Sequence, residues 1–195
     1  AYGDVAETNL YSYADMSITK NEFTLNGGVR LDYFNFGYLD RLSQADIGIQ
    51  KAKASTISPK INLQYALNNS TQFFIKLGRG FHSNDTRVII DQTANHVLPG
   101  VTSFDIGAIF KPIKNMAINI AAWQLLSQQE FVYVGDAGLV EPSGKSKRYG
   151  LDVSLRYQPY SSLFVYTDIN FAVPRSVDEL EGENFIPLAP TFTNT

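Results

Sequence analysis

Apolar and polar residues alternate with a period of two over several segments of the chain, each of about 9 to 12 residues. This is the pattern of β-strands whose two faces meet different surroundings, because neighbouring side chains on a strand point to opposite sides. The clearest segment is Tyr149–Gln158, in which aromatic and aliphatic residues occupy the odd positions. The pattern predicts about eight strands, in chain order Asn9–Thr19, Phe23–Phe36, Lys60–Leu67, Gln72–Leu77, Phe104–Phe110, Met116–Leu125, Tyr149–Gln158 and Leu163–Val173.

Short turns join these strands in pairs, and longer connections separate one pair from the next. The turns lie at Lys20-Asn21, Asn68-Asn69-Ser70, Lys114-Asn115 and Tyr160-Ser161. They recur about every 45 to 48 residues, and connections such as Gly37–Thr56 and Phe81–Gly100 have about 20 residues, which is uncommon in compact soluble domains. We therefore expect an all-β, antiparallel up-and-down meander. The alternation of short and long connections is typical of transmembrane β-barrels.

A soluble β-sandwich with one wet face would show the same alternation, so the height of the apolar stripe matters. Tyr149 and Tyr157 enclose aliphatic residues on one face. At about 3.3 Å per residue and a strand tilt of about 40°, the two tyrosines are about 20 Å apart along the membrane normal. Membrane barrels carry an apolar band of about 25 Å between two aromatic girdles. The stripe favours the barrel, and the soluble binding module remains an alternative.

A second alternative is a small barrel of about eight strands that closes on itself and has a structural or adhesive role. Such an interior must be filled, and the polar face carries charges that can form an ion-pair network, namely Arg30, Asp32, Lys60, Lys76, Asp105, Arg148, Asp152, Arg156 and Asp168. The segment Pro174–Thr195 follows the last predicted strand and has no role in such a barrel.

Composition narrows the function classes. The chain of 195 residues has no cysteine, which excludes a disulfide scaffold and a thiolate metal site. Its net charge is -3 and its basic residues are scattered, so we expect no nucleic-acid partner. No apolar run reaches the roughly 18 residues of a spanning helix. The 13 Phe and 11 Tyr favour strands, and no motif predicts a cofactor.

Five phrases in order along the chain resemble the barrel of TonB-dependent outer-membrane receptors, in particular the branch common in the Bacteroidetes lineage. They are Ser58–Asn62, Gly80–Arg87, Gln129–Asp136, Ser143–Asp152 and Asn184–Pro190. The resemblance covers about residues 28 to 192. It implies that residues 1–195 are the C-terminal part of one receptor barrel domain, without the plug and the final strand.

The resemblance also implies a function. A receptor of this family is an active transporter of the bacterial outer membrane for a large or scarce nutrient, such as a siderophore, a cobalamin-like compound or an oligosaccharide. Its implied partners are the lipid bilayer, the plug domain and TonB, with Phe81–Gly100 and Asp136–Ser146 outside and the short turns in the periplasm. An open segment of the barrel wall has two unpaired edges, which must pair with something or be covered.

The chain offers few candidates for chemistry. Residues at the root of a long loop, or expected on the lumen face, are ligand-binding candidates, namely His82, Asn84, Asp85, Arg87, Trp123, Arg148 and Arg156. A zinc site needs three or four convergent ligands, and the distant pair His82 and His96 does not supply them. No G-x-S-x-G motif is present. We expect neither a metal site nor catalytic residues, and no enzyme.

Overall fold

The computed structural model describes residues 3–41, 48–82, 86, 97–129, 131–134, 139–142, 144–186 and 189–195, with the backbone alone for 131–134 and 139–142. Its strands are β1 (Gly3–Lys20), β2 (Phe23–Asp40), β3 (Gln50–Asn68), β4 (Thr71–Phe81), β5 (Gly100–Phe110), β6 (Met116–Ser127), β7 (Phe131–Val134), β8 (Leu139–Pro142), β9 (Ser146–Tyr160), β10 (Leu163–Ser176) and β11 (Phe192–Asn194). Among these residues no helix is long and apolar enough to cross a bilayer.

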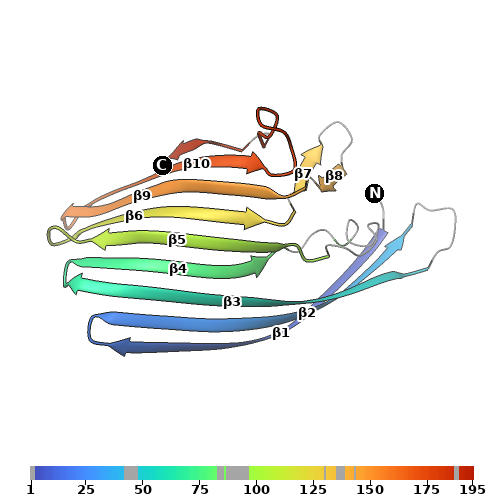
Figure 1. Ribbon diagram of the computed structural model, residues 1–195, viewed down its shortest axis with the longest axis horizontal. Coiled ribbons are helices and arrows are strands. Elements are labelled where there is room, and N and C mark those ends of the chain that lie inside the picture. The colour runs from blue at the N-terminus through green and yellow to red at the C-terminus, as the bar shows by residue number, and fades with distance from the viewer. Residues whose placement is uncertain are drawn as a thin grey trace.

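The strands form one curved antiparallel sheet in which sequence neighbours lie side by side (Figure 1). The sheet has nine strands in the order β1-β2-β3-β4-β5-β6-β9-β10-β11, and β7 and β8 form a separate two-stranded hairpin. Every predicted strand lies within an observed one, so the predicted meander is confirmed. The turn residues Asn21 and Asn115 have positive φ angles of 52° and 64°, a conformation that asparagine tolerates better than most residues.

The structure corrects three boundaries. β2 continues to Asp40, and β3 begins already at Gln50. The predicted loop Gly37–Thr56 is therefore mostly strand. β8 occupies part of the predicted loop Asp136–Ser146. Hydrophobic periodicity misses the start of β3 because the residues that face Phe34 and Phe36 are the small Ala52 and Ala54, while the opposite face carries Lys51 and Lys53. The segment after Pro174 leads into β11, which pairs with β10 as a ninth strand of the sheet.

The register separates the side chains into two faces. On the outer face, one row across the strands is apolar throughout, namely Ile18, Leu25, Leu63, Ile75, Ile106, Ala122, Leu151 and Phe171. On the inner face, the next row is largely polar, namely Ser17, Asn26, Asn62, Lys76, Asp105 and Trp123. Inner side chains are also the more buried ones. Along β2, Asp32, Phe34 and Phe36 are buried, whereas Leu31 and Tyr33 on the other face are exposed. The predicted alternation therefore separates an apolar face from a polar one.

The sheet is open. β1 pairs only with β2, and β11 pairs only with β10, so the described strands do not close into a barrel. The small self-closed barrel is thus not the observed arrangement. A β-sandwich would place a second large sheet against one face, and the described residues contain only the small β7–β8 hairpin besides the main sheet.

Candidate functional site on the inner face

The middle of the inner face carries an ion pair that crosses a strand. Asp15 on β1 and Lys60 on β3 are separated by β2, and the Asp15 carboxylate lies 2.9 Å from the Lys60 Nζ. Gly28 of β2 lies between them, and a Cβ atom there would be 2.7 Å from both side chains. The two charges meet because Gly28 has no side chain.

Amide side chains extend this network across the sheet. Asn26 donates to Asp15 Oδ1 at 3.0 Å, and Asn62 donates to Asn26 Oδ1 at 2.9 Å. Closer to the short turns, Gln72 donates to Gln64 at 2.8 Å. Inner side chains of β1 to β4 therefore satisfy one another laterally, as polar groups facing a barrel interior must.

Trp123 belongs to a second cluster, on β6 and β9. Its indole Nε1 donates to Asp152 Oδ1 at 2.8 Å, and Asn170 of β10 donates to the same oxygen. The ring lies over Gly150, whose Cβ, if present, would be 2.5 Å from Trp123 Cζ2. Trp123 is therefore fixed in place by a carboxylate beside it and by a glycine beneath it.

Arg156 forms a third cluster near the short turns. Its guanidinium donates to both carboxylate oxygens of Asp168 at 2.8 Å, and also to the carbonyl of Leu155 at 2.9 Å. A bidentate pair of this kind fixes the guanidinium plane. Since the Arg156 side chain is 52% exposed, solvent screens the pair and its contribution to stability is small.

A further charge cluster lies near the middle of β1 and β2, on the long-loop side of Asp15. Arg30 donates twice to Asp32 at 2.8 Å, and Asn9 donates to Asp32 at 3.1 Å. The Arg30 guanidinium lies 4.0 Å from the centre of the Tyr11 ring. The Asp32 side chain is fully buried, whereas Arg30 is 42% exposed. The arrangement fixes a partly exposed cation on the inner face.

An aromatic cluster lies beyond this pair, further toward the long loops. Phe34 and Phe36 stack at 5.4 Å, and Phe81 packs edge-on against Phe34 at 5.5 Å. Val97 and Leu98, which precede β5, pack on the same cluster. The long connection between β4 and β5 is therefore anchored at its C-terminal end to the inner face of β2.

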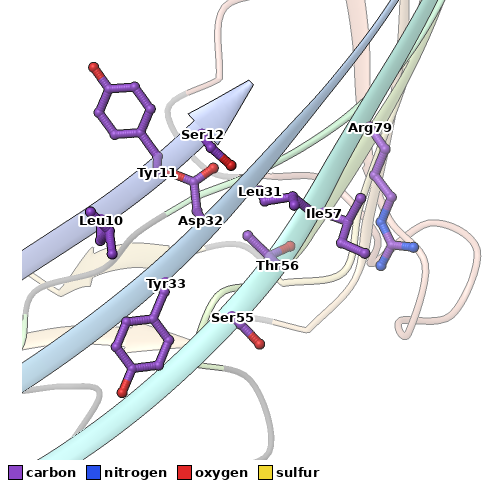
Figure 2. Close-up of a pocket in the computed structure, with 10 residues that line it drawn as sticks. All are labelled: Leu10, Tyr11, Ser12, Leu31, Asp32, Tyr33, Ser55, Thr56, Ile57 and Arg79. Atoms are coloured by element: carbon purple, nitrogen blue, oxygen red, sulfur yellow. The ribbon is translucent and has the colours of Figure 1, made fainter. Parts of the chain in front are cut away.

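A hollow of about 840 Å³ lies where β3 and β4 separate. The two strands pair only up to Lys60 and Gly78, and β1 to β3 continue past that point without β4. Figure 2 shows Leu31, Ile57 and Arg79 on one side of the strands, and Tyr11 on the other. The hollow exposes apolar side chains and one guanidinium, and it carries no set of convergent catalytic groups.

The predicted ligand-binding residues do not form one site. Asn84, Asp85 and Arg87 lie outside the described residues. The backbone N–H of His82 donates to the Pro99 carbonyl at 3.0 Å, which closes the base of the long loop. Trp123, Arg148 and Arg156 all occupy inner positions, as predicted, but at different heights of the sheet.

Sequence analysis named Arg30 and Asp32 as polar-face charges and missed their partners Asn9 and Tyr11. The signal for Asn9 and Tyr11 was their odd positions in β1, opposite Phe34 and Asp32 of β2. That signal requires the register between the strands, because Asn9 and Asp32 are 23 residues apart in sequence.

Several solved structures share this fold. The alcaligin outer-membrane receptor FauA of Bordetella pertussis superposes with a TM-score of 0.76 at 12% identity, over 98% of this chain and 34% of FauA. The ferric yersiniabactin uptake receptor FyuA of Yersinia pestis superposes with a TM-score of 0.72 at 14% identity, over 98% of this chain and 31% of FyuA. The copper transporter OprC superposes with a TM-score of 0.68 at 14% identity, over 89% of this chain and 30% of OprC.

The chain thus spans about a third of the length of these proteins. No curated protein matches it. The family described as TonB dependent receptor-like, beta-barrel, matches residues 1–194, which is nearly the whole chain. With the meander, the apolar outer face and the charged inner face described above, this match shows that the chain belongs to the TonB-dependent receptor β-barrel family.

Proposed function

We propose that residues 1–195 are part of the wall of a single barrel domain in an outer-membrane importer that is energised through TonB. One observation carries the proposal: a single meander sheet, matched to this family over residues 1–194, separates an apolar outer face from a charged inner face. An apolar outer face is what contact with lipid requires, and a charged inner face is what a filled lumen requires. The open edges at β1 and β11 then pair with further strands of the same barrel.

The short turns give the proposed orientation. They join β1 to β2, β3 to β4, β5 to β6 and β9 to β10 at one end of the sheet (Figure 1). In outer-membrane barrels the short turns are periplasmic and the longer loops are outside. The long connection after Phe81 and the β7–β8 hairpin are therefore extracellular, and Arg30 lies nearer the outer mouth than Arg156.

The inner face is the surface that a plug domain would contact. Asp15, Lys60 and Arg156 are each at least 38% exposed while engaged in ion pairs, so they can exchange partners with a plug at little cost. The proposed cycle begins with ligand capture by the outer loops and the plug. A pull from the inner membrane, transmitted by TonB, then rearranges the plug while the wall stays rigid.

The cargo in this proposal is a large or scarce nutrient. Similar structures carry names that refer to alcaligin, ferric yersiniabactin and copper, so one wall architecture accompanies different cargoes. A siderophore, a cobalamin-like compound and an oligosaccharide are the classes to test. His82, Trp123, Arg148 and Arg156, together with Asn84, Asp85 and Arg87, are the proposed contacts of this chain with ligand or plug. We propose no enzymatic role.

Uptake by cells tests the proposal. Cells expressing the full-length receptor that contains this chain are supplied with radiolabelled ferric siderophores, cobalamin or oligosaccharides, with and without TonB. Accumulation of one class only when both receptor and TonB are present is the expected result. Uptake that persists unchanged without TonB, or a receptor that does not fractionate with the outer membrane, would contradict the proposal.

A further inference from the structure

A row of basic side chains crosses the outer face near its long-loop end. Arg79, Thr102, Leu126, Lys147 and Arg175 occupy consecutive positions in one register row of β4, β5, β6, β9 and β10. We call Arg79, Lys147 and Arg175 the basic row. The two outer-face rows below it toward the short turns carry no charged residue on these five strands. The basic row therefore marks the upper edge of the apolar band.

The placement of Lys147 and Arg175 has an electrostatic cost. The two residues are direct cross-strand partners, and like charges in that position repel each other. Their neighbours include aromatic rings and a backbone carbonyl: Lys147 Nζ lies 6.0 Å from the centre of the Tyr149 ring, the Arg175 guanidinium lies 4.3 Å from the centre of the Phe185 ring, and Arg175 donates to the Pro174 carbonyl at 2.8 Å. Among the described residues, no carboxylate forms an ion pair with Arg79, Lys147 or Arg175. An anion from outside the chain would relieve this repulsion.

The distribution of charge over the whole chain makes this row unusual. The chain has a net charge of -3, yet on the outer face of β1 to β6, β9 and β10 the only acid is Asp4, which already accepts a hydrogen bond from Arg41 Nε at 3.0 Å. The acids of the sheet otherwise face inward, as Asp15, Asp32 and Asp152 do. A basic edge on an otherwise acidic protein is complementary to an anionic surface beside it.

A groove of about 340 Å³ lies at the Arg79 end of this row, and neither Lys147 nor Arg175 lines it. Its lining includes Arg79, Thr102, Leu126 and Gln128, with Lys145 at the far side. The side-chain Oε1 of Gln128 accepts a hydrogen bond from the Gly100 N–H at 2.8 Å, and the Asp178 carboxylate accepts one from the Lys145 backbone N–H at 2.7 Å. Arg79 and Lys145 bring positive charge to the groove, and Asp178 places a negative charge beside Lys145. The groove opens at the boundary between charged and apolar rows.

We propose that Lys147 and Arg175 of the basic row bind the phosphate group of a phosphorylated lipid in the outer leaflet. Two cations on neighbouring strands match a phosphate monoester. The acyl chains then lie on the apolar rows below, over Phe104, Tyr149 and Val173. This amphipathic match favours a lipid over free phosphate. The inference uses the proposed orientation, with the long loops outside.

Native mass spectrometry of the detergent-purified full-length receptor tests the site. Dioleoyl phosphatidic acid is the probe, dioleoyl phosphatidylcholine is the neutral comparison, and inorganic phosphate is the competitor. Each cation near an anionic lipid is worth roughly a fivefold change in binding, so Lys147→Gln/Arg175→Gln is expected to lower retention of phosphatidic acid about 25-fold. The matched control, Lys20→Gln/Lys114→Gln, removes two cations at the short-turn end and should change retention less than twofold.

Three results would overturn the lipid site. One is equal retention by the wild type and Lys147→Gln/Arg175→Gln. Another is an equal loss in the Lys20→Gln/Lys114→Gln control, which would mean nonspecific charge attraction. The last is full displacement by inorganic phosphate, which would mean a phosphate site without a lipid. Lys147→Arg/Arg175→Lys keeps both charges and should retain the lipid, which separates loss of charge from misfolding. Uptake is not the readout, so failure here leaves the transport proposal standing.

Discussion

Gly150 offers the sharpest test of how the inner face is packed. Its position on β9 lies beneath the Trp123 ring, and a Cβ atom there would be 2.5 Å from Trp123 Cζ2 and 2.3 Å from the Phe171 carbonyl oxygen. Both distances are shorter than real Cβ contacts, and the oxygen belongs to the backbone of the neighbouring strand. Gly150→Ala must therefore move the indole away from Asp152 and strain the pairing of β9 with β10.

The size of the effect follows from two contributions. Overpacking a filled site costs about 1 to 3 kcal/mol. Loss of the hydrogen bond from Trp123 to the charged Asp152 costs about 1.5 to 3 kcal/mol. The conformational gain from replacing a strand glycine by alanine offsets about 0.5 to 1 kcal/mol. The free energy of unfolding should therefore fall by about 3 kcal/mol.

Urea unfolding of the full-length receptor in detergent measures this change, with the loss of heat-modifiable gel migration as the readout. Trp123 is the only tryptophan of this chain, and the difference in emission between wild type and Trp123→Phe isolates its signal. In Gly150→Ala this signal should shift because the indole leaves Asp152. Gly27→Ala is the matched control, since nothing lies within 4 Å of its added Cβ. Equal stabilities of the two variants with unchanged Trp123 emission would refute the packing argument.

Three further substitutions test the remaining clusters by the same unfolding measurement. Gly28→Ala should open the ion pair between Asp15 and Lys60 and lower the free energy of unfolding by about 0.5 to 1 kcal/mol. The same substitution should lower it no further in a Lys60→Met background, where the ion pair is already absent. Asp32→Ala removes a fully buried acceptor from Arg30 and should cost about 2 kcal/mol, whereas a change below about 0.5 kcal/mol would show that Arg30 finds another partner. Phe36→Ala, at a site with 1% exposure, should cost about 3 to 5 kcal/mol, and a cost as small as that of Gly28→Ala would mean that the aromatic cluster is loosely packed.

The prediction of the fold succeeded where one face of a strand is apolar. Tyr149–Gln158 was predicted from alternation alone, and β9 contains it with three more residues at its start and two more at its end. Alternation failed for the outer ends of β2 and β3, where Lys51 and Lys53 of β3 pair with Gly37 and Asn35 of β2. Those stretches are strands because of backbone pairing, and hydrophobicity does not report backbone pairing.

The candidate site was predictable only in part. Trp123 and Arg156 were placed on the inner face from their position in the alternation, since the face depends only on odd or even numbering. Their partners were not predictable in this way. Asp152 lies 29 residues after Trp123, and only the register of β6 against β9 brings the two side chains together.

The sequence by itself therefore determined the class of the protein: an all-β meander of hairpins with one apolar face, and membership of a receptor family. These properties follow from local periodicity and from short phrases, which need no knowledge of what lies beside each strand. The tertiary structure alone decided that Asp15 reaches Lys60 across Gly28, and that Arg79, Lys147 and Arg175 share one row. Such contacts depend on register, because a shift of one residue moves every side chain to the other face.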